Sequence, residues 1–70
     1  MSGLVKRSFS LSGHRTSVAL EAEFWAVLTA EAARRQLSLA GLVAALDATR
    51  HPDRTLASAL RLYALDAVRA

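Results

Sequence analysis

The sequence predicts a mostly α-helical domain in which one or two N-terminal β-strands pair across a homodimer and three helices follow. Apolar and polar residues alternate before position 21, the spacing becomes helical after it, and 53% of the 70 residues are hydrophobic. A chain this short buries only about 60% of its unfolded surface. Because it has no cysteine for disulfides, association with a second copy is the expected way to extend its core.

The N-terminal segment follows the period-two pattern of a β-strand from Arg7 to Leu20. Gly13 and His14 interrupt the alternation, so the segment is either two short strands joined by a bend or a loose arm followed by one strand. Successive side chains of a strand point to opposite faces. The residues expected to face the core are Thr16, Val18 and Leu20, and those expected to face outward are Arg15, Ser17 and Ala19.

Three helices are expected after Leu20, over about residues 22–36, 39–49 and 56–68. Ser38 is the predicted N-cap of the second helix, and Asp53 or Thr55 is the predicted cap of the third. Gly41 lies among small residues of the second helix. It indicates either the close approach of the same helix from a second subunit or a glycine that is simply tolerated.

The basic residues are unevenly distributed along the chain. Residues 1–20 contain Lys6, Arg7 and Arg15 and no acidic residue, whereas residues 21–70 contain six basic and six acidic residues. The formal net charge of +3 therefore lies entirely in the N-terminal segment. This concentration indicates an acidic partner there. The alternative is a solvated basic strand edge that prevents aggregation.

A single strand of this length leaves unpaired N–H and C=O groups along both edges. The expected partner is the same strand of a second copy, in antiparallel orientation. We also expect the third helix, which is apolar around most of its circumference, to be buried by association beyond the monomer. The predicted residues of a dimer or higher-oligomer interface are Val18, Leu20, Phe24, Trp25, Gly41, Leu42, Leu62 and Leu65.

Three runs of the chain resemble a known family: GHRTSVALE at 13–21, FW at 24–25 and LASALR at 56–61. Together they are similar to the short bacterial ribbon-helix-helix domain proteins, which share the Arc and MetJ type of fold and add a third C-terminal helix. The resemblance covers about residues 5–66. We expect a basic arm over residues 1–8 and one ribbon-helix-helix domain over residues 9–70.

The resemblance implies a homodimeric transcriptional regulator that inserts an intersubunit antiparallel β-ribbon into the major groove of double-stranded DNA. Arginine can bind guanine through two hydrogen bonds, so Arg15 is the strongest expected base reader. Helix N-termini suit phosphate, and further basic residues strengthen binding without reading sequence. The expected DNA-binding residues are Arg15, Ser17 and Ala19 in the groove, with Ser38, Lys6 and Arg7 on phosphates.

The competing prediction is a protein-interaction or oligomerisation module, including an antitoxin-like protein, that binds a protein partner through its third helix. Catalysis is not expected, because His14 and His51 have neither metal-ligand spacing nor a cysteine to complement them. We expect no cofactor and no metal. The sequence has neither an apolar run of about 18 residues nor the apolar core of a signal peptide, so a cytoplasmic protein without membrane contact is expected.

Overall fold

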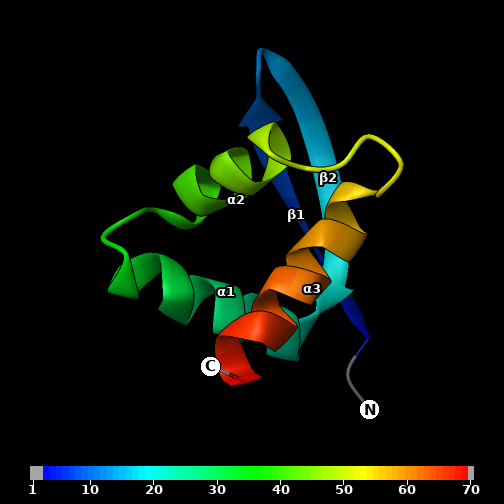
Figure 1. Cartoon of the computed structure of the whole chain (residues 1–70). Helices are drawn as coiled ribbons and strands as arrows, with labels where there is room; N and C mark the ends of the chain where they lie inside the picture. The colour runs from blue at the N-terminus through cyan, green and yellow to red at the C-terminus, as the bar shows by residue number, and fades with distance from the viewer. Residues whose placement is uncertain (1–2, 70) are drawn as a thin grey trace.

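The computed structural model describes residues 3–69 and shows an antiparallel β-hairpin followed by three helices (Figure 1). The helices lie on one side of the hairpin and leave its other face open. The described elements, in chain order, are β1 (Leu4–Leu11), β2 (His14–Glu21), α1 (Ala22–Arg34), α2 (Leu39–Ala48) and α3 (Leu56–Arg69).

A two-residue turn at Ser12 and Gly13 closes the hairpin. Both residues have positive φ, 51° and 81°, as the type I′ turn requires, and the twist of that turn matches the twist of the strands it joins. The Cα pairing begins with Leu11 opposite His14 and continues to the far end of both strands. Of the two alternatives that the sequence left open, the structure therefore has two strands joined by a turn.

The strand pairing departs from the sequence prediction. The sequence predicts that β2 pairs with its own copy across a dimer, but its partner in the structure is β1 of the same chain. The physical reason is that a short turn brings the neighbouring strand into register at a low entropic cost. Positions 4–8 of the expected arm are thus the first five residues of β1, while Met1 and Ser2 lie outside the described residues.

The hydrophobic core lies between the inner face of the hairpin and the three helices. The predicted inward face of β2 is confirmed, because Val18 and Leu20 are buried and Thr16 is half-buried. The strand β1 adds two buried side chains, Phe9 and Leu11, from the segment in which the sequence predicts period-two alternation. The buried core consists of Phe9, Leu11, Val18, Leu20, Trp25, Leu28, Ala32, Leu42, Val43, Leu60 and Ala64.

Several residues that the sequence assigns to a dimer interface belong to this core of the single chain. They are Val18, Leu20, Trp25 and Leu42, with Phe24 packed against them. Leu20 and Leu42 have 0% exposed surface, so a second copy cannot contact them while the chain keeps this fold. Their burial is explained by β1. This strand of the same chain packs where the sequence predicts a second subunit to pack.

The glycine in α2 also has a reason within the chain. A Cβ atom at Gly41 would lie 3.1 Å from the Oγ of Ser38, which is closer than ordinary van der Waals contact. That same hydroxyl accepts a hydrogen bond from the Gly41 N–H at 2.9 Å. The capping contact, rather than a neighbouring helix, accounts for the small residue in this structure.

The helix α1 ends earlier than position 36, because a C-terminal motif stops it. The Leu37 N–H donates to the Ala32 carbonyl at 2.8 Å, and the Gln36 N–H donates to the Ala33 carbonyl at 3.0 Å. This is the Schellman arrangement, which needs a left-handed residue after the helix. Gln36 supplies it with φ 61°. The ends of α2 and α3 each differ from their predicted positions by one residue.

We expect Gln36→Gly to stabilise the protein by about 0.5–1 kcal/mol, because glycine adopts positive φ without the steric cost of a Cβ. Urea unfolding followed by circular dichroism measures the change. Gln36→Ala is the matched control, since alanine keeps the Cβ, and it should stay close to wild type. A Gln36→Gly midpoint at or below that of Gln36→Ala would contradict the prediction.

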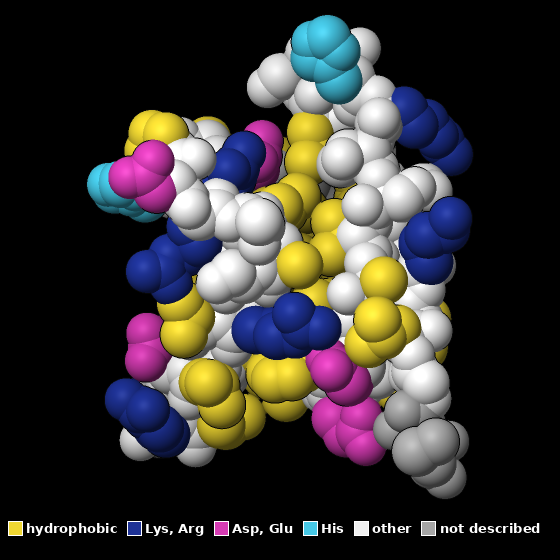
Figure 2. Space-filling view, turned by 90° about the vertical axis from the view of Figure 1, so that its right-hand side faces the viewer, with side chains coloured by type: hydrophobic (Ala, Val, Ile, Leu, Met, Phe, Trp, Pro, Cys, Tyr) yellow, Lys and Arg dark blue, Asp and Glu magenta, His cyan; other side chains and the backbone are white. Residues whose placement is uncertain are grey.

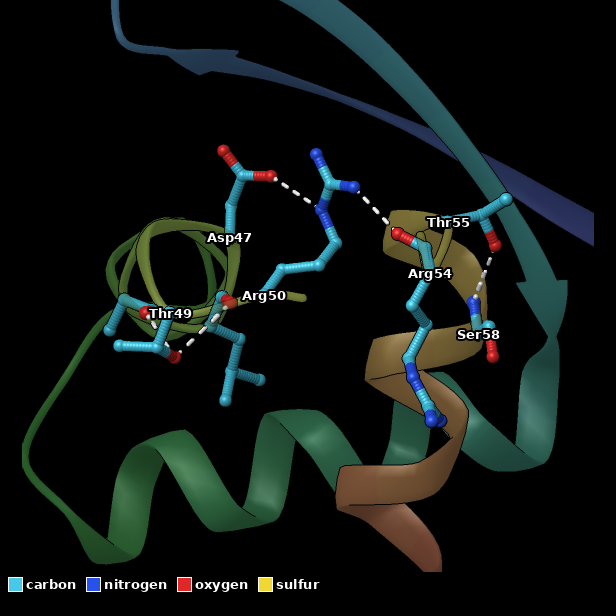
Figure 3. Close-up of polar contacts among 8 residues, drawn as sticks. Asp47, Thr49, Arg50, Arg54, Thr55 and Ser58 are labelled. Atoms are coloured by element: carbon cyan, nitrogen blue, oxygen red, sulfur yellow. Dashed lines mark hydrogen bonds and ion pairs between the residues drawn. The ribbon is translucent and has the colours of Figure 1, made fainter. Parts of the chain in front are cut away.

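The connection between α2 and α3 is held by a small polar cluster (Figure 3). The Nε of Arg50 lies 3.2 Å from an Asp47 carboxylate oxygen, and its Nη1 donates to the Arg54 carbonyl at 2.6 Å. Thr55 accepts a hydrogen bond from the Ser58 N–H at 3.1 Å. Thr55 is therefore the N-cap of α3, one of the two candidates from the sequence, and the cluster fixes the direction in which α3 leaves the turn.

Candidate nucleic-acid interface

The outer face of the hairpin carries six small, polar or basic side chains in three opposed pairs. The Cα pairing places Lys6 opposite Ala19, Ser8 opposite Ser17, and Ser10 opposite Arg15. All six lie on the face opposite to the buried Phe9 and Val18, because side chains alternate along a strand. We call these six residues the ribbon face. Its central pair is joined by hydroxyl oxygens 3.1 Å apart.

The ribbon face is basic. Lys6 and Arg15 are exposed, and within residues 3–69 neither side chain forms an ion pair or side-chain hydrogen bond. Figure 2 shows the hairpin along the right-hand side of the molecule, with basic side chains projecting from its upper part and no acidic side chain between them in that view. Two unneutralised cations on a narrow ribbon suit a polyanionic partner.

Arg7 lies on the other face of the hairpin. The sequence groups it with Lys6 as a phosphate contact, but neighbouring residues of a strand point in opposite directions. Its guanidinium carbon lies 5.5 Å from the centroid of the Trp25 ring, a cation–π contact. In this structure Arg7 therefore helps to hold β1 against α1 instead of extending the ribbon face.

Ser38 is at the N-terminus of α2 as predicted. Its hydroxyl accepts from the Gly41 N–H and its carbonyl accepts from the Leu42 N–H at 3.0 Å, so it closes the first turn. Figure 1 shows this end of α2 on the opposite side of the molecule from β2. One chain therefore does not bring Ser38 together with the ribbon face.

An ion pair fixes the far end of the ribbon to the helices. Glu21 ends β2 and accepts two hydrogen bonds from the Arg61 guanidinium, at 3.0 and 3.1 Å. Arg61 also lies over the Phe24 ring at 5.8 Å. A hydrogen bond from its own backbone N–H, together with the Arg61 guanidinium, holds the pKa of Glu21 below its ordinary value. The one acidic residue at the end of the ribbon is thus engaged by α3.

The sequence prediction misses two of the three β1 residues of this site. Ser8 and Ser10 stand on the same face as Arg15 and Ser17, yet from β1 the sequence prediction assigns only Lys6 and Arg7 to DNA. The signal was present in the alternation of Ser8 and Ser10 with Phe9 and Leu11, which has the same period as that of β2.

Other kinds of site find no support in the part of the chain that the structure describes. Residues 3–69 contain no group of three or more histidine, cysteine, aspartate or glutamate side chains placed to hold a metal ion. Over the same residues no helix combines the length and the apolar character needed to cross a membrane. His14 and His51 are both exposed.

Comparison with known proteins agrees with the architecture. A family model described as a ribbon-helix-helix domain matches residues 4–68, from the start of β1 almost to the end of α3. Neither the search of curated proteins nor the search of solved structures gave a match. The match spans both strands and all three helices. The resemblance found in the sequence is confirmed: the chain belongs to the ribbon-helix-helix domain family, whose fold is typical of DNA-binding regulators and antitoxins.

Proposed function

We propose that this protein is a non-enzymatic DNA-binding transcriptional regulator that places its β-ribbon in the major groove of duplex DNA. The observation that carries the proposal is the ribbon face, which exposes Lys6 and Arg15 beside serine hydroxyls and leaves both cations without a partner among residues 3–69. The major groove is about 12 Å wide and admits a two-stranded ribbon. The family supports the same role.

Each side chain of the ribbon face has a chemistry that fits the groove. Arg15 can donate two hydrogen bonds to guanine O6 and N7, and Ser17 can donate or accept at several base edges. Ala19 can contact a thymine methyl group. Lys6 fits a phosphate, which strengthens binding without reading the sequence. In a homodimer, the N-terminus of α2 at Ser38 would add phosphate contacts from outside the ribbon face.

Arg15→Ala is the direct test. Removing a bidentate base contact costs about 1–3 kcal/mol, so we expect the affinity for duplex DNA to fall by about fivefold to 150-fold. A titration of a random duplex pool, monitored by fluorescence anisotropy at low and moderate salt, measures it. Binding by the wild type should weaken steeply as salt rises.

The matched control is Arg69→Ala, which removes one arginine from the end of α3 rather than from the hairpin. Its affinity should equal that of the wild type. The proposal fails if wild-type protein does not bind the pool, or if Arg15→Ala binds as well as Arg69→Ala.

An oligomerisation or partner-docking role is the second candidate, and exposed apolar residues of α3 favour it. Leu62 is 43% exposed, Leu65 is 42% exposed and Val68 is 60% exposed. Side chains of this kind are unusual as a group on a helix of a small soluble domain. We propose that a second copy covers this face in a homodimer, which leaves the hairpin free for DNA; a protein partner of an antitoxin would use the same surface.

We expect Leu65→Asp to lower the molar mass of the protein in light scattering from that of a dimer to that of a monomer. The helix should remain folded, because position 65 is partly solvated in the single chain, so the circular dichroism spectrum should not change. Asp66→Leu, on the neighbouring exposed position, is the control and should not dissociate the dimer. A monomeric wild type would remove the dimer from the proposal.

A further inference from the structure

A polar contact holds each strand of the hairpin at the end opposite the turn. On β1, the Val5 carbonyl accepts a hydrogen bond from the indole N–H of Trp25 at 2.7 Å. On β2, the Glu21 carboxylate accepts two hydrogen bonds from Arg61, at 3.0 and 3.1 Å. Val5 pairs with Leu20, the residue before Glu21, so the two contacts lie at the same end of the ribbon. One of them comes from α1 and the other from α3.

Glu21 occupies the corner at which β2 turns directly into α1. The strand ends at Glu21 and the helix begins at Ala22, with no loop residue between them. The N-cap position favours short side chains that accept hydrogen bonds from the first free N–H groups of a helix, but the Glu21 side chain makes no such bond. Capping therefore does not account for a glutamate at this corner. Its contact with Arg61, 40 residues further along the chain, does.

The apolar core holds the hairpin against the helices but leaves its direction to polar contacts. Val18 and Leu20 are buried, and the burial of apolar side chains is a non-directional force. The contact of the Arg61 guanidinium is directional, because two of its N–H groups converge on one Glu21 oxygen. Its central carbon also lies over the Phe24 ring, 5.8 Å from the centroid. Arg61 can therefore fix the angle at which the hairpin lies on the helices.

The ion pair itself contributes little to the folding free energy. The side chains of Arg61 and Glu21 are 34% and 39% exposed, and water weakens the attraction between partly exposed charges. A substitution at either residue is therefore expected to leave the fold intact. An effect of such a substitution on DNA binding can then be separated from an effect on stability.

A small rotation at this corner becomes a large displacement further along β2. Arg15 precedes Glu21 in the same strand, about 20 Å away at 3.3 Å per residue. A rotation of about 10° at Glu21 would move Arg15 by about 3.5 Å over that length. Hydrogen bonds form over donor–acceptor distances of only about 2.7–3.2 Å. A displacement of this size would therefore remove the two hydrogen bonds that an arginine can donate to guanine.

We propose that Arg61 is a positioning residue for DNA binding, which through Glu21 fixes the angle between the ribbon and α3. The ion pair acts on β2, so it acts equally on a ribbon formed within one chain and on one formed with β2 of a second copy. On α3, Arg61 lies in line with the exposed Leu65 and Val68, at i, i+4 and i+7. The face that a second copy covers thus continues into the ion pair. The role of Arg61 rests on the proposed DNA binding and adds to it a residue outside the ribbon face.

The first arm of the experiment compares Arg61→Ala with the Arg69→Ala control in titrations of the random duplex pool. Arg69 is the matched arginine, since it lies on the same helix and pairs with Asp66 of α3 rather than with the hairpin. We expect Arg61→Ala to lower the affinity by about fivefold or more, with an unchanged logarithmic salt slope. An arginine that held a phosphate itself would lower that slope by about one, and this result would overturn the positioning role.

The second arm uses Glu21→Gln, which separates position from charge. It raises the formal net charge of +3 by one unit, so a charge effect alone would tighten binding to DNA. Loss of the ion pair predicts the opposite: about the same weakening as Arg61→Ala, and no further loss when the two changes are combined. Glutamine has nearly the shape of glutamate, so this variant should keep the fold, which circular dichroism checks. Tighter binding by Glu21→Gln, or additive losses in the double variant, would overturn the inference.

The outcomes also distinguish the role of Arg61 from the proposed function itself. If both variants bind the pool like the Arg69→Ala control while Arg15→Ala binds weakly, the ribbon binds DNA without help from this ion pair. The positioning role then fails and the proposed function stands. If wild-type protein binds no duplex, both fail.

Discussion

Trp25→Ala is expected to remove most of the folding free energy of this protein. Trp25 is 3% exposed, its ring centroid lies 5.8 Å from that of Phe9, and its indole N–H donates to the Val5 carbonyl at 2.7 Å. Deleting a buried tryptophan costs about 3–5 kcal/mol. A 70-residue chain has only about 3–10 kcal/mol in total, at 0.05–0.15 kcal/mol per residue. Urea unfolding followed by far-ultraviolet circular dichroism measures the loss.

Trp25→Phe separates packing from the hydrogen bond. It keeps a ring against Phe9 but loses the donor to Val5, so we expect it to cost less than half as much as Trp25→Ala. Repeating the unfolding of Trp25→Phe in the Leu65→Asp variant, which we expect to be monomeric, tests the location of this residue. A core residue of one chain costs the same free energy of unfolding in the monomer as in the dimer, whereas a dimer-interface residue costs little once the dimer has dissociated. A cost that disappears in the Leu65→Asp variant would return Trp25 to the interface that the sequence predicts.

The period-two pattern was sufficient to predict the faces of β2 but not its partner. Burial of Val18 and Leu20 follows from alternation alone, since one face must be covered. Which strand pairs with it does not follow, because β1 carries the same alternation and a second copy would satisfy the same hydrogen bonds. The turn at Ser12 and Gly13 decides the pairing through its backbone angles. A serine–glycine turn is a weaker signal than the asparagine–glycine turn most typical of a tight hairpin.

The interface prediction shows a second limit of the sequence. The surplus of apolar residues indicates that the three helices alone cannot bury all of them. It does not say which segment buries the rest. Once β1 adds Phe9 and Leu11 to the core, Leu20 and Leu42 are fully buried within one chain. Among the leucines of the predicted interface, Leu62 and Leu65 on α3 remain exposed. Their exposure depends on which face of α3 packs on the core. The sequence does not decide this, because α3 is apolar around most of its circumference.

The basic site was predicted in part for a similar reason. The concentration of charge before position 21 correctly indicated the hairpin as the basic element. The total charge of a segment does not say which way a side chain points, however, so the sequence predicts the same role for Lys6 and Arg7. The strand separates them: Lys6 lies opposite Ala19 on the ribbon face, while Arg7 lies opposite Val18 beside Trp25. A one-residue difference in position decides which cation lies on the ribbon face.

Gly13→Val is expected to disrupt the hairpin and with it the ribbon face. Nothing lies within 4 Å of a Cβ placed at Gly13, so space is not the obstacle. Its φ of 81° is the obstacle, because a side chain in the left-handed region costs about 1–2 kcal/mol, and a β-branched one more. We expect a loss of about 2 kcal/mol, which lowers the melting temperature of a domain of this size by about 10 °C.

Gly3→Val is the matched control, since a Cβ at Gly3 also meets nothing within 4 Å and Gly3 is not among the residues with positive φ. It should melt with the wild type. Ser12→Asn should change stability in the other direction by a few tenths of a kcal/mol, because asparagine tolerates the left-handed conformation that Ser12 adopts. If instead β2 pairs with a second copy and β1 is a loose arm, the turn contributes nothing. In that case Gly13→Val would melt and bind DNA as Gly3→Val does, which is the result that would refute a ribbon formed within one chain.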